Sequence, residues 1–200
     1  MIKVGLTGGI STGKSTVSLM LKEAKFNIID ADIISREVLV KYPEILEKVR
    51  AQFGEGFFDW RGDFRRKEFG NHIFRFPKQR VKYEEIIMPY IKKEIFSEID
   101  RLEKKGEKIV IVDAPTLIET KLNEEMDFVV LVSVDHSTQL QRLKARDKLS
   151  NNDALNRINS QMPLDKKKEV CNIIIENNKD LLYTKEQVDD FIDFINEVIW

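Results

Sequence analysis

The stretch Gly8-Gly9-Ile10-Ser11-Thr12-Gly13-Lys14-Ser15 completes the pattern G-x-x-x-x-G-K-[ST] near the start of the chain. An apolar run at residues 2–6 precedes it and predicts a strand, while residues 15–21 predict a helix. A strand, a glycine-rich loop and a helix in this order are typical of a loop that cradles phosphate groups. We therefore expect a nucleoside triphosphate to bind here.

Each residue type in this loop favours phosphate binding. Gly8 and Gly13 allow backbone conformations that a Cβ would block, so that successive N–H groups can converge on phosphate oxygens. The helix that follows directs the positive end of its dipole to the same place. We expect Lys14 to bridge the outer phosphates and the Ser15 hydroxyl to hold Mg²⁺. The predicted nucleotide contacts in this stretch are Gly8, Gly9, Ile10, Ser11, Thr12, Gly13, Lys14, Ser15, Thr16 and Val17.

The composition narrows the class of protein. The 200 residues suffice for one domain with a substantial core. The 33 basic and 34 acidic residues nearly cancel, so no global field favours nucleic acid or a membrane surface as partner. We find no signal peptide and no run of about 18 apolar residues that could span a bilayer. With a single cysteine, Cys171, no internal disulfide can form, and we expect a cytoplasmic protein. The sequence carries no signal for an oligomeric state.

Apolar runs recur along the chain with helical segments between them, which is the pattern of a parallel sheet covered by helices. The candidate strands are residues 3–7, 27–30, 108–113, 128–134 and 172–176. We therefore predict an α/β fold of the P-loop NTPase class, nucleoside-kinase-like, with a five-stranded parallel sheet flanked by helices.

The chain, residues 1–200, is predicted to form a single kinase domain with two helical additions. Residues 41–106 have little strand character, and we expect a helical insertion there that binds the acceptor. Residues 136–168 are expected to form a helical lid. Pro89 predicts a kink or a break in the long helix of the insertion. In the last helix, Thr184 and Gln187 have the spacing of a capping box.

Carboxylates follow two of the predicted strands. In such sheets ligands bind beyond the carboxyl ends of the strands, so these residues are candidates for the site. Asp32 is our candidate for the general base that accepts the proton of an acceptor hydroxyl, with capping of the next helix as the alternative. For Asp30 we give equal weight to two roles: capping that helix, and contacting metal or substrate. We expect Asp113 to hold Mg²⁺ through water, or else to cap the turn at Pro115.

Basic residues form two further candidate sites. Arg142 and Arg146 lie four residues apart on one predicted helix face, where they could close over ATP; an exposed, solvated face is the alternative. Residues 61–82 carry an excess of six positive charges, which suits an anionic acceptor or an ordinary helix surface.

Taken together, these pieces resemble the dephospho-CoA kinase family over nearly the whole chain. The combination of a Thr-Gly-Gly-Ile opening with Asp-Ala-Asp is fairly specific for that family. The matching stretches are Gly5-Leu6-Thr7-Gly8-Gly9-Ile10, Gly13-Lys14-Ser15-Thr16, Ile29-Asp30-Ala31-Asp32, Arg36-Glu37, Arg66, Phe69-Gly70, Ile73-Phe74, Asp113-Ala114-Pro115, Glu119, Gln139-Leu140-Gln141-Arg142, Arg146-Asp147, Gln161 and Ile175-Glu176-Asn177-Asn178.

The resemblance implies that ATP, with Mg²⁺, phosphorylates the ribose 3′-hydroxyl of dephospho-CoA to give coenzyme A and ADP. It implies Asp32 as the base, Lys14 and Arg142 as groups that stabilise phosphate charge, and Arg36 and Arg66 as acceptor contacts. The chain departs from the family pattern at Met88, where the family usually has His, and at residues 166–168, where lysines occupy a region that usually carries arginine. We expect weaker lid chemistry at these lysines.

Two other functions compete with this one. Shikimate kinase also has Asp-x-Asp after its second strand, but its Gly-Gly-Arg acceptor motif is absent here. A nucleotide-dependent switch is the alternative from another class, because Asp59-Trp60-Arg61-Gly62 matches the D-x-x-G pattern of GTPases. However, no convincing parallel strand precedes that pattern, and the Asn-Lys-x-Asp guanine motif is missing.

Overall fold

The computed structural model describes residues 1–199, and the chain divides into two compact units. The first unit consists of Met1–Asp30 together with the chain from Glu98 onward, and the second unit is Ala31–Ser97. Each is described by itself below.

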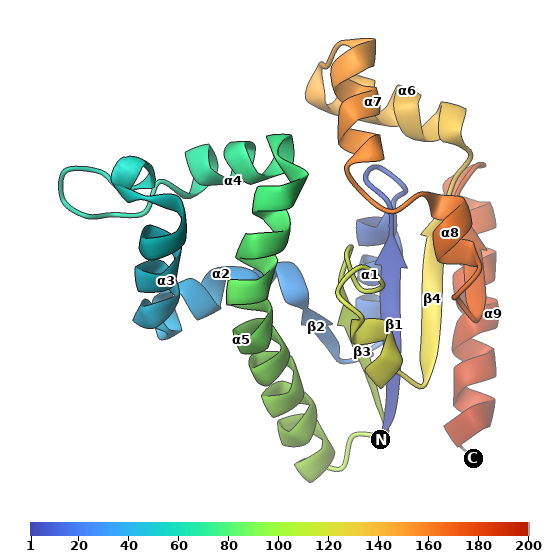
Figure 1. The fold of residues 1–200 in the computed structure, drawn as a ribbon. Coiled ribbons are helices and arrows are strands. Elements are labelled where there is room, and N and C mark those ends of the chain that lie inside the picture. The colour runs from blue at the N-terminus through green and yellow to red at the C-terminus, as the bar shows by residue number, and fades with distance from the viewer. Residues whose placement is uncertain (200) are drawn as a thin grey trace. The chain divides into compact units, whose positions relative to one another are not determined.

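The first unit contains a parallel sheet in the order β2-β3-β1-β4-β5 (Figure 1). All five predicted strands are present, with ends that differ from the prediction by no more than one residue. Parallel strands buried on both faces require apolar residues at nearly every position, which explains the unbroken Ile-Val-Ile-Val of β3. The strands are β1 Ile2–Gly8, β2 Ile28–Asp30, β3 Ile109–Asp113, β4 Phe128–Ser133 and β5 Ile173–Glu176.

One face of this sheet is covered by α1 Lys14–Glu23 and α9 Leu181–Ile199 (Figure 1). Alternate residues of β1, such as Val4 and Leu6, pack in one core with Val17 of α1 and Phe191 of α9. The remaining elements of the unit are η2 Leu122–Glu125, α6 His136–Asp147, α7 Asn151–Asn159 and α8 Leu164–Lys168.

The start of α9 corrects one prediction. The helix begins at Leu181, where the Asp180 carboxylate accepts a hydrogen bond from the Tyr183 N–H at 2.9 Å, so Thr184 and Gln187 do not form a capping box. The Gln187 side chain instead brackets the backbone of Glu176, with both bonds at 2.8 Å. A capping pattern matches by spacing alone, and here the helix starts one turn earlier than that pattern predicts.

The second unit is helical. Its elements are α2 Ala31–Lys41, α3 Pro43–Phe53, η1 Glu55–Phe57, α4 Arg66–Arg75 and most of α5 Pro77–Lys104, which continues into the first unit. Its core includes Phe69, whose ring lies about 5 Å from those of Phe53, Phe57, Phe64 and Tyr83. Burial raises the pKa of the Tyr83 phenol to about 12. The predicted break at Pro89 is wrong, because α5 runs continuously through this exposed position, whereas the alternative, a kink, stays a prediction.

Candidate active site

The loop between β1 and α1 has a backbone that is built to bind an anion. Gly13 has a left-handed conformation, with φ +89°, and Ser11 has φ +60°. The backbone N–H groups of Ser11, Gly13, Lys14 and Ser15 donate to no other residue in the part of the chain that the structure describes. Several free donors at a helix N-terminus, together with the helix dipole, favour a phosphate group at this position.

Two glycines of the loop are required by close neighbours. A Cβ on Gly13 would lie 2.0 Å from the Asn177 side-chain nitrogen, and one on Gly9 would lie 2.8 Å from that of Gln139. Heavy atoms that are not bonded cannot approach so closely. A Cβ at either position would therefore force the neighbouring amide side chain to move.

Amide side chains from the C-terminal half of the chain hold the loop. The Ile10 N–H donates to Gln161 Oε1 at 2.8 Å, and Gln139 Nε2 donates to the Ile10 carbonyl at 2.9 Å. Asn177 Nδ2 donates to the Thr12 carbonyl at 2.9 Å. Because the two ends of a trans peptide point in opposite directions, a carbonyl held by Asn177 turns the next N–H, that of Gly13, away from Asn177. These bonds orient the loop before any ligand is bound.

Lys14 and Asp113 form an ion pair beside the loop. Asp113 ends β3 and is only 4% exposed, and its register partners are Leu6 of β1 and Asp30 at the end of β2. The structure thus brings Lys14 and two of the predicted carboxylates to one edge of the sheet. The ion pair with Lys14 is enough to explain why the Asp113 carboxylate is buried. The alternative role, in which Asp113 only caps the turn at Pro115, is not needed for that.

The residues at this edge fit a magnesium ion. Ser15 is exposed in the first turn of α1, and the Asp113 carboxylate offers a second hard oxygen ligand. No group of three His, Cys, Asp or Glu side chains able to hold a metal occurs among residues 1–199. Mg²⁺ does not require one, since it usually binds through one or two protein oxygens, substrate phosphates and water.

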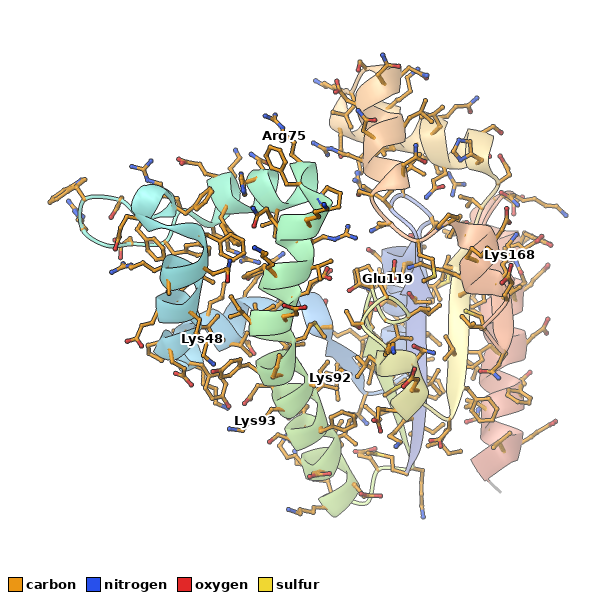
Figure 2. All side chains as sticks on the ribbon, in the orientation of Figure 1. Lys48, Arg75, Lys92, Lys93, Glu119 and Lys168 are labelled. Atoms are coloured by element: carbon orange, nitrogen blue, oxygen red, sulfur yellow. The ribbon has the colours of Figure 1, made fainter. Side chains whose placement is uncertain are left out.

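Lys167, on α8, is a buried cation directly behind the loop. Its ammonium is 3.0 Å from Glu119, 2.7 Å from the Pro115 carbonyl and 3.3 Å from the Gly8 carbonyl. Burial lowers the pKa of Lys167, and the Glu119 carboxylate opposes that shift. Glu119 lies in the segment that follows β3, while the neighbouring Lys168 is on α8 (Figure 2). Lys167 is fully buried, and the weaker lid chemistry that we expect at residues 166–168 stays a prediction.

Arg142 and Arg146, the two arginines that the sequence predicts for a lid, lie on α6. Asp135 caps this helix by accepting from the Thr138 N–H at 2.8 Å. Hydrogen bonds from the Ser137 hydroxyl, the Thr138 N–H and the Thr138 hydroxyl hold the pKa of Asp135 well below its ordinary value. Arg142 is half-buried and Arg146 exposed. Arg146 bonds Asp147 at 2.7 Å.

A cavity of about 440 Å³ lies beside α6, where its lining includes Gln139, Gln161 and Lys168. Both glutamines also hold Ile10, so this cavity borders the phosphate loop.

The second unit carries the other predicted residues. Asp32 is exposed in the first turn of α2, and Arg36 is exposed further along the same helix. Arg66 is the exposed first residue of α4, and Arg75 is its last residue (Figure 2). The predicted site residues are therefore found in both units. The first unit contains the phosphate loop with Lys14, Asp113 and the two arginines predicted for the lid. The second unit contains Asp32, Arg36 and Arg66.

The comparison with protein families shows to which family the chain belongs. The dephospho-CoA kinase family model matches residues 2–182. The chain belongs to this family. It is 63% identical over 194 residues to a dephospho-CoA kinase from Clostridium perfringens, covering 97% of this chain and 98% of the relative.

Two solved structures show the same fold as this member of the dephospho-CoA kinase family. Dephospho-CoA kinase from Campylobacter jejuni superimposes with a TM-score of 0.73 at 24% identity, covering 99% of this chain and 98% of that one. Shikimate kinase from Acinetobacter baumannii superimposes with a TM-score of 0.54 at 18% identity, covering 98% of this chain and 94% of that one. The predicted P-loop kinase fold and the predicted family are thus confirmed, and the family is favoured over shikimate kinase.

The D-x-x-G pattern has a structural explanation within this dephospho-CoA kinase family member. Asp59 Oδ1 accepts from the N–H groups of Arg61 and Asp63 at 2.8 and 2.9 Å, and Gly62 has φ +88°. These residues form a tight turn between Phe58 and Phe64, which pair in an isolated antiparallel bridge. The turn directly follows α3 and η1 and not a parallel strand, so the pattern is not that of a GTPase switch.

Proposed function

We propose that this chain transfers the terminal phosphoryl group of ATP to the ribose 3′-hydroxyl of dephospho-CoA, giving coenzyme A and ADP. One observation supports it above all: an anion-binding loop with free N–H donors, on a chain closely similar to a dephospho-CoA kinase. The Ser11 hydroxyl adds to this, because it is buried and has no hydrogen-bond partner among the described residues. A phosphate oxygen would satisfy it.

Lys14 stabilises the phosphate charge in this proposal. Its ammonium already lies beside the loop, bound to Asp113. A triphosphate carries more charge than one carboxylate, so we expect Lys14 to turn from Asp113 to the outer phosphates when nucleotide binds. Asp113 and Ser15 are then available to hold Mg²⁺ with its water. The ion would draw charge from the transferring phosphoryl group.

Asp32 is the proposed general base. It follows the end of β2 by two residues, and Asp30 at that end pairs in register with Asp113. In the proposed step the 3′-oxygen bonds to the γ-phosphorus, the bond from that phosphorus to the β–γ bridging oxygen breaks, and the 3′-hydroxyl proton passes to the Asp32 carboxylate. ADP leaves with the bonding electron pair.

Arginines complete the proposed site. Arg142 offsets charge on the phosphoryl group, and Arg146 contacts the nucleotide as the lid, residues 136–168, closes. The helical insertion, residues 41–106, holds the acceptor, with Arg36 at its edge and Arg66 within it. The excess positive charge of residues 61–82 suits the diphosphate of dephospho-CoA.

The same proposal includes the cellular compartment and the partners of the enzyme. We propose a cytoplasmic enzyme that acts on small molecules, without nucleic acid or a membrane. No helix within residues 1–199 is long and apolar enough to cross a membrane.

A direct assay tests the function. Purified chain is given ATP and Mg²⁺ with dephospho-CoA, with shikimate or with no acceptor, and ADP is followed together with the mass of the acceptor. We expect rapid ADP release only with dephospho-CoA, with a product heavier by one phosphoryl group. Equal ADP release in all three mixtures would leave a plain NTPase and refute the proposal.

A further inference from the structure

A charged side chain is buried behind the phosphate loop at a position that the transfer mechanism does not use. Lys167 has no exposed surface, and its four-carbon stem carries an ammonium into the interior of the first unit. Burial of a lone cation is strongly unfavourable, so its surroundings must supply both hydrogen bonds and a counter-charge.

The surroundings of Lys167 satisfy every donor it has. An ammonium offers three N–H groups, and three oxygens receive them: Glu119 Oε1 at 3.0 Å, the Pro115 carbonyl at 2.7 Å and the Gly8 carbonyl at 3.3 Å. Glu119 supplies the charge, and its Oε1 also accepts from the Met162 N–H at 3.2 Å. The Pro115 carbonyl also accepts from the Thr7 hydroxyl at 3.2 Å.

These three acceptors come from segments that meet at the loop. Gly8 is both the last residue of β1 and the first glycine of the phosphate motif. Pro115 and Glu119 follow Asp113, the partner of Lys14, by two and six residues. The ammonium thus ties α8 to the first peptide of the loop and to the segment that carries the Asp113 carboxylate.

The bond to Gly8 has a consequence for the loop. Its carbonyl points toward Lys167, so the N–H at the other end of the same trans peptide, that of Gly9, points away from the ammonium. The peptide that opens the loop is thereby fixed in one orientation without any ligand.

We propose that Lys167 is a positioning residue for nucleotide binding, acting through the Gly8 carbonyl to hold the phosphate loop in its anion-binding shape, with Glu119 as its counter-ion. The inference deepens the proposed function and rests on it for the reaction measured. An apolar side chain of similar length would fill the same space at lower cost in stability, so a purely structural role does not require a charge here.

Two variants separate positioning from stability. Lys167→Met alone leaves the largely buried Glu119 carboxylate without its cation, so a loss of stability in that variant would decide nothing. Lys167→Met/Glu119→Gln removes both charges, and the glutamine still offers an oxygen to the Met162 N–H. We expect this double variant to unfold within a few degrees of the wild type. Its dissociation constant and KM for ATP should nevertheless rise about tenfold to a hundredfold, with the KM for dephospho-CoA unchanged.

The matched control is Lys185→Met. Lys185 lies on α9, is exposed and forms a surface ion pair with Asp189, which is four residues further along the same helix. Surface ion pairs contribute little, so we expect nucleotide affinity and the unfolding temperature to stay at wild-type values. If the double variant fails to fold, Lys167→Gln/Glu119→Gln replaces it with the same expected outcomes. The glutamine amide at position 167 can still donate hydrogen bonds to the acceptors that Lys167 now satisfies.

Binding is measured with ATP and no acceptor, by calorimetry, and KM values for both substrates by steady-state kinetics. A folded double variant with wild-type affinity for ATP would overturn the positioning role. An equal rise in both KM values would also overturn it, since that is general damage. If the wild type bound ATP but did not phosphorylate dephospho-CoA, the proposed function would fail, while the binding comparison would still test Lys167.

Discussion

Gly13→Ala tests whether the phosphate loop is held in shape by a side chain more than 160 residues away. Gly13 has φ +89°, and its missing Cβ would lie 2.0 Å from Asn177 Nδ2. The substitution therefore introduces two separate penalties. One is the left-handed backbone, and the other is the collision with Asn177.

The size of each penalty follows from the structure. A left-handed backbone costs a residue with a Cβ about 1–2 kcal/mol. Asn177 cannot yield freely, because it donates to the Thr12 carbonyl at 2.9 Å and accepts from the Thr184 hydroxyl at 2.7 Å. Each lost hydrogen bond costs about 0.5–1.5 kcal/mol, so the free energy of unfolding should fall by about 2–5 kcal/mol in total. For a chain of this size, that lowers Tm by roughly 5–15 °C.

Gly106→Ala is the matched control. Gly106 has φ +84°, and nothing lies within 4 Å of the position of its Cβ. It bears the backbone penalty alone, so we expect Tm to fall by about 3–6 °C.

The assay is thermal unfolding by circular dichroism without nucleotide, completed as a double-mutant cycle with Asn177→Ala. Removing the Asn177 side chain abolishes the collision, so in that background Gly13→Ala should cost no more than Gly106→Ala does. An equal cost of Gly13→Ala in both backgrounds would show that Asn177 does not constrain the loop. The reasoning about long-range support would then be wrong.

Three further predictions concern single side chains. Asp32→Asn should lower kcat by about 10²–10⁴ because the proton acceptor is lost, with little change in ATP affinity; near-normal turnover would remove Asp32 from the mechanism. Lys14→Met should abolish transfer and leave Asp113 buried without its partner, and Lys14→Met/Asp113→Asn should recover the unfolding temperature but not activity. Recovery of transfer would contradict the role of Lys14. Burial raises the pKa of Cys171 from 9.0 to about 11, so at pH 8 its thiolate should be about a hundredfold scarcer than in the unfolded chain. Iodoacetamide should accordingly react far more slowly with native than with denatured protein, and equal rates would contradict the burial. By the same shift, the contribution of this thiol to stability is complete below about pH 9 and is lost as the pH rises toward 11.

The fold was largely predictable because its signals are local. Buried parallel strands require continuous apolar runs, and the residues of β3 and β4 form such runs without interruption. Predictions based on a single residue were less reliable. Pro89 does not break α5, because a helix can lose one N–H where the position is open to water, as it is here.

The phosphate loop was predictable for a related reason, since its residues are contiguous and their spacing is set by the geometry of one turn. Asp113 could also be found, because the end of an apolar run marks the ligand edge of the sheet. Asp32 remains a prediction based on this rule and on the resemblance to the family.

The side chains that support the loop could not be predicted in this way. Gln139, Gln161, Lys167 and Asn177 bond to loop residues between 129 and 165 positions away, and their sequence spacing has no period. The family resemblance includes Gln139, Gln161 and Asn177 but implies no role for them, and the sequence predicts Lys167 only as part of the lid. Their roles depend on which strand ends meet at one edge of the sheet, which only the tertiary structure specifies. A motif of eight residues therefore identifies where phosphate binds, whereas the shape of that site depends on polar side chains from four separate later segments. We infer that replacing any of these four side chains should weaken ATP binding by altering the loop, and the double variant of Lys167 and Glu119 measures that effect directly.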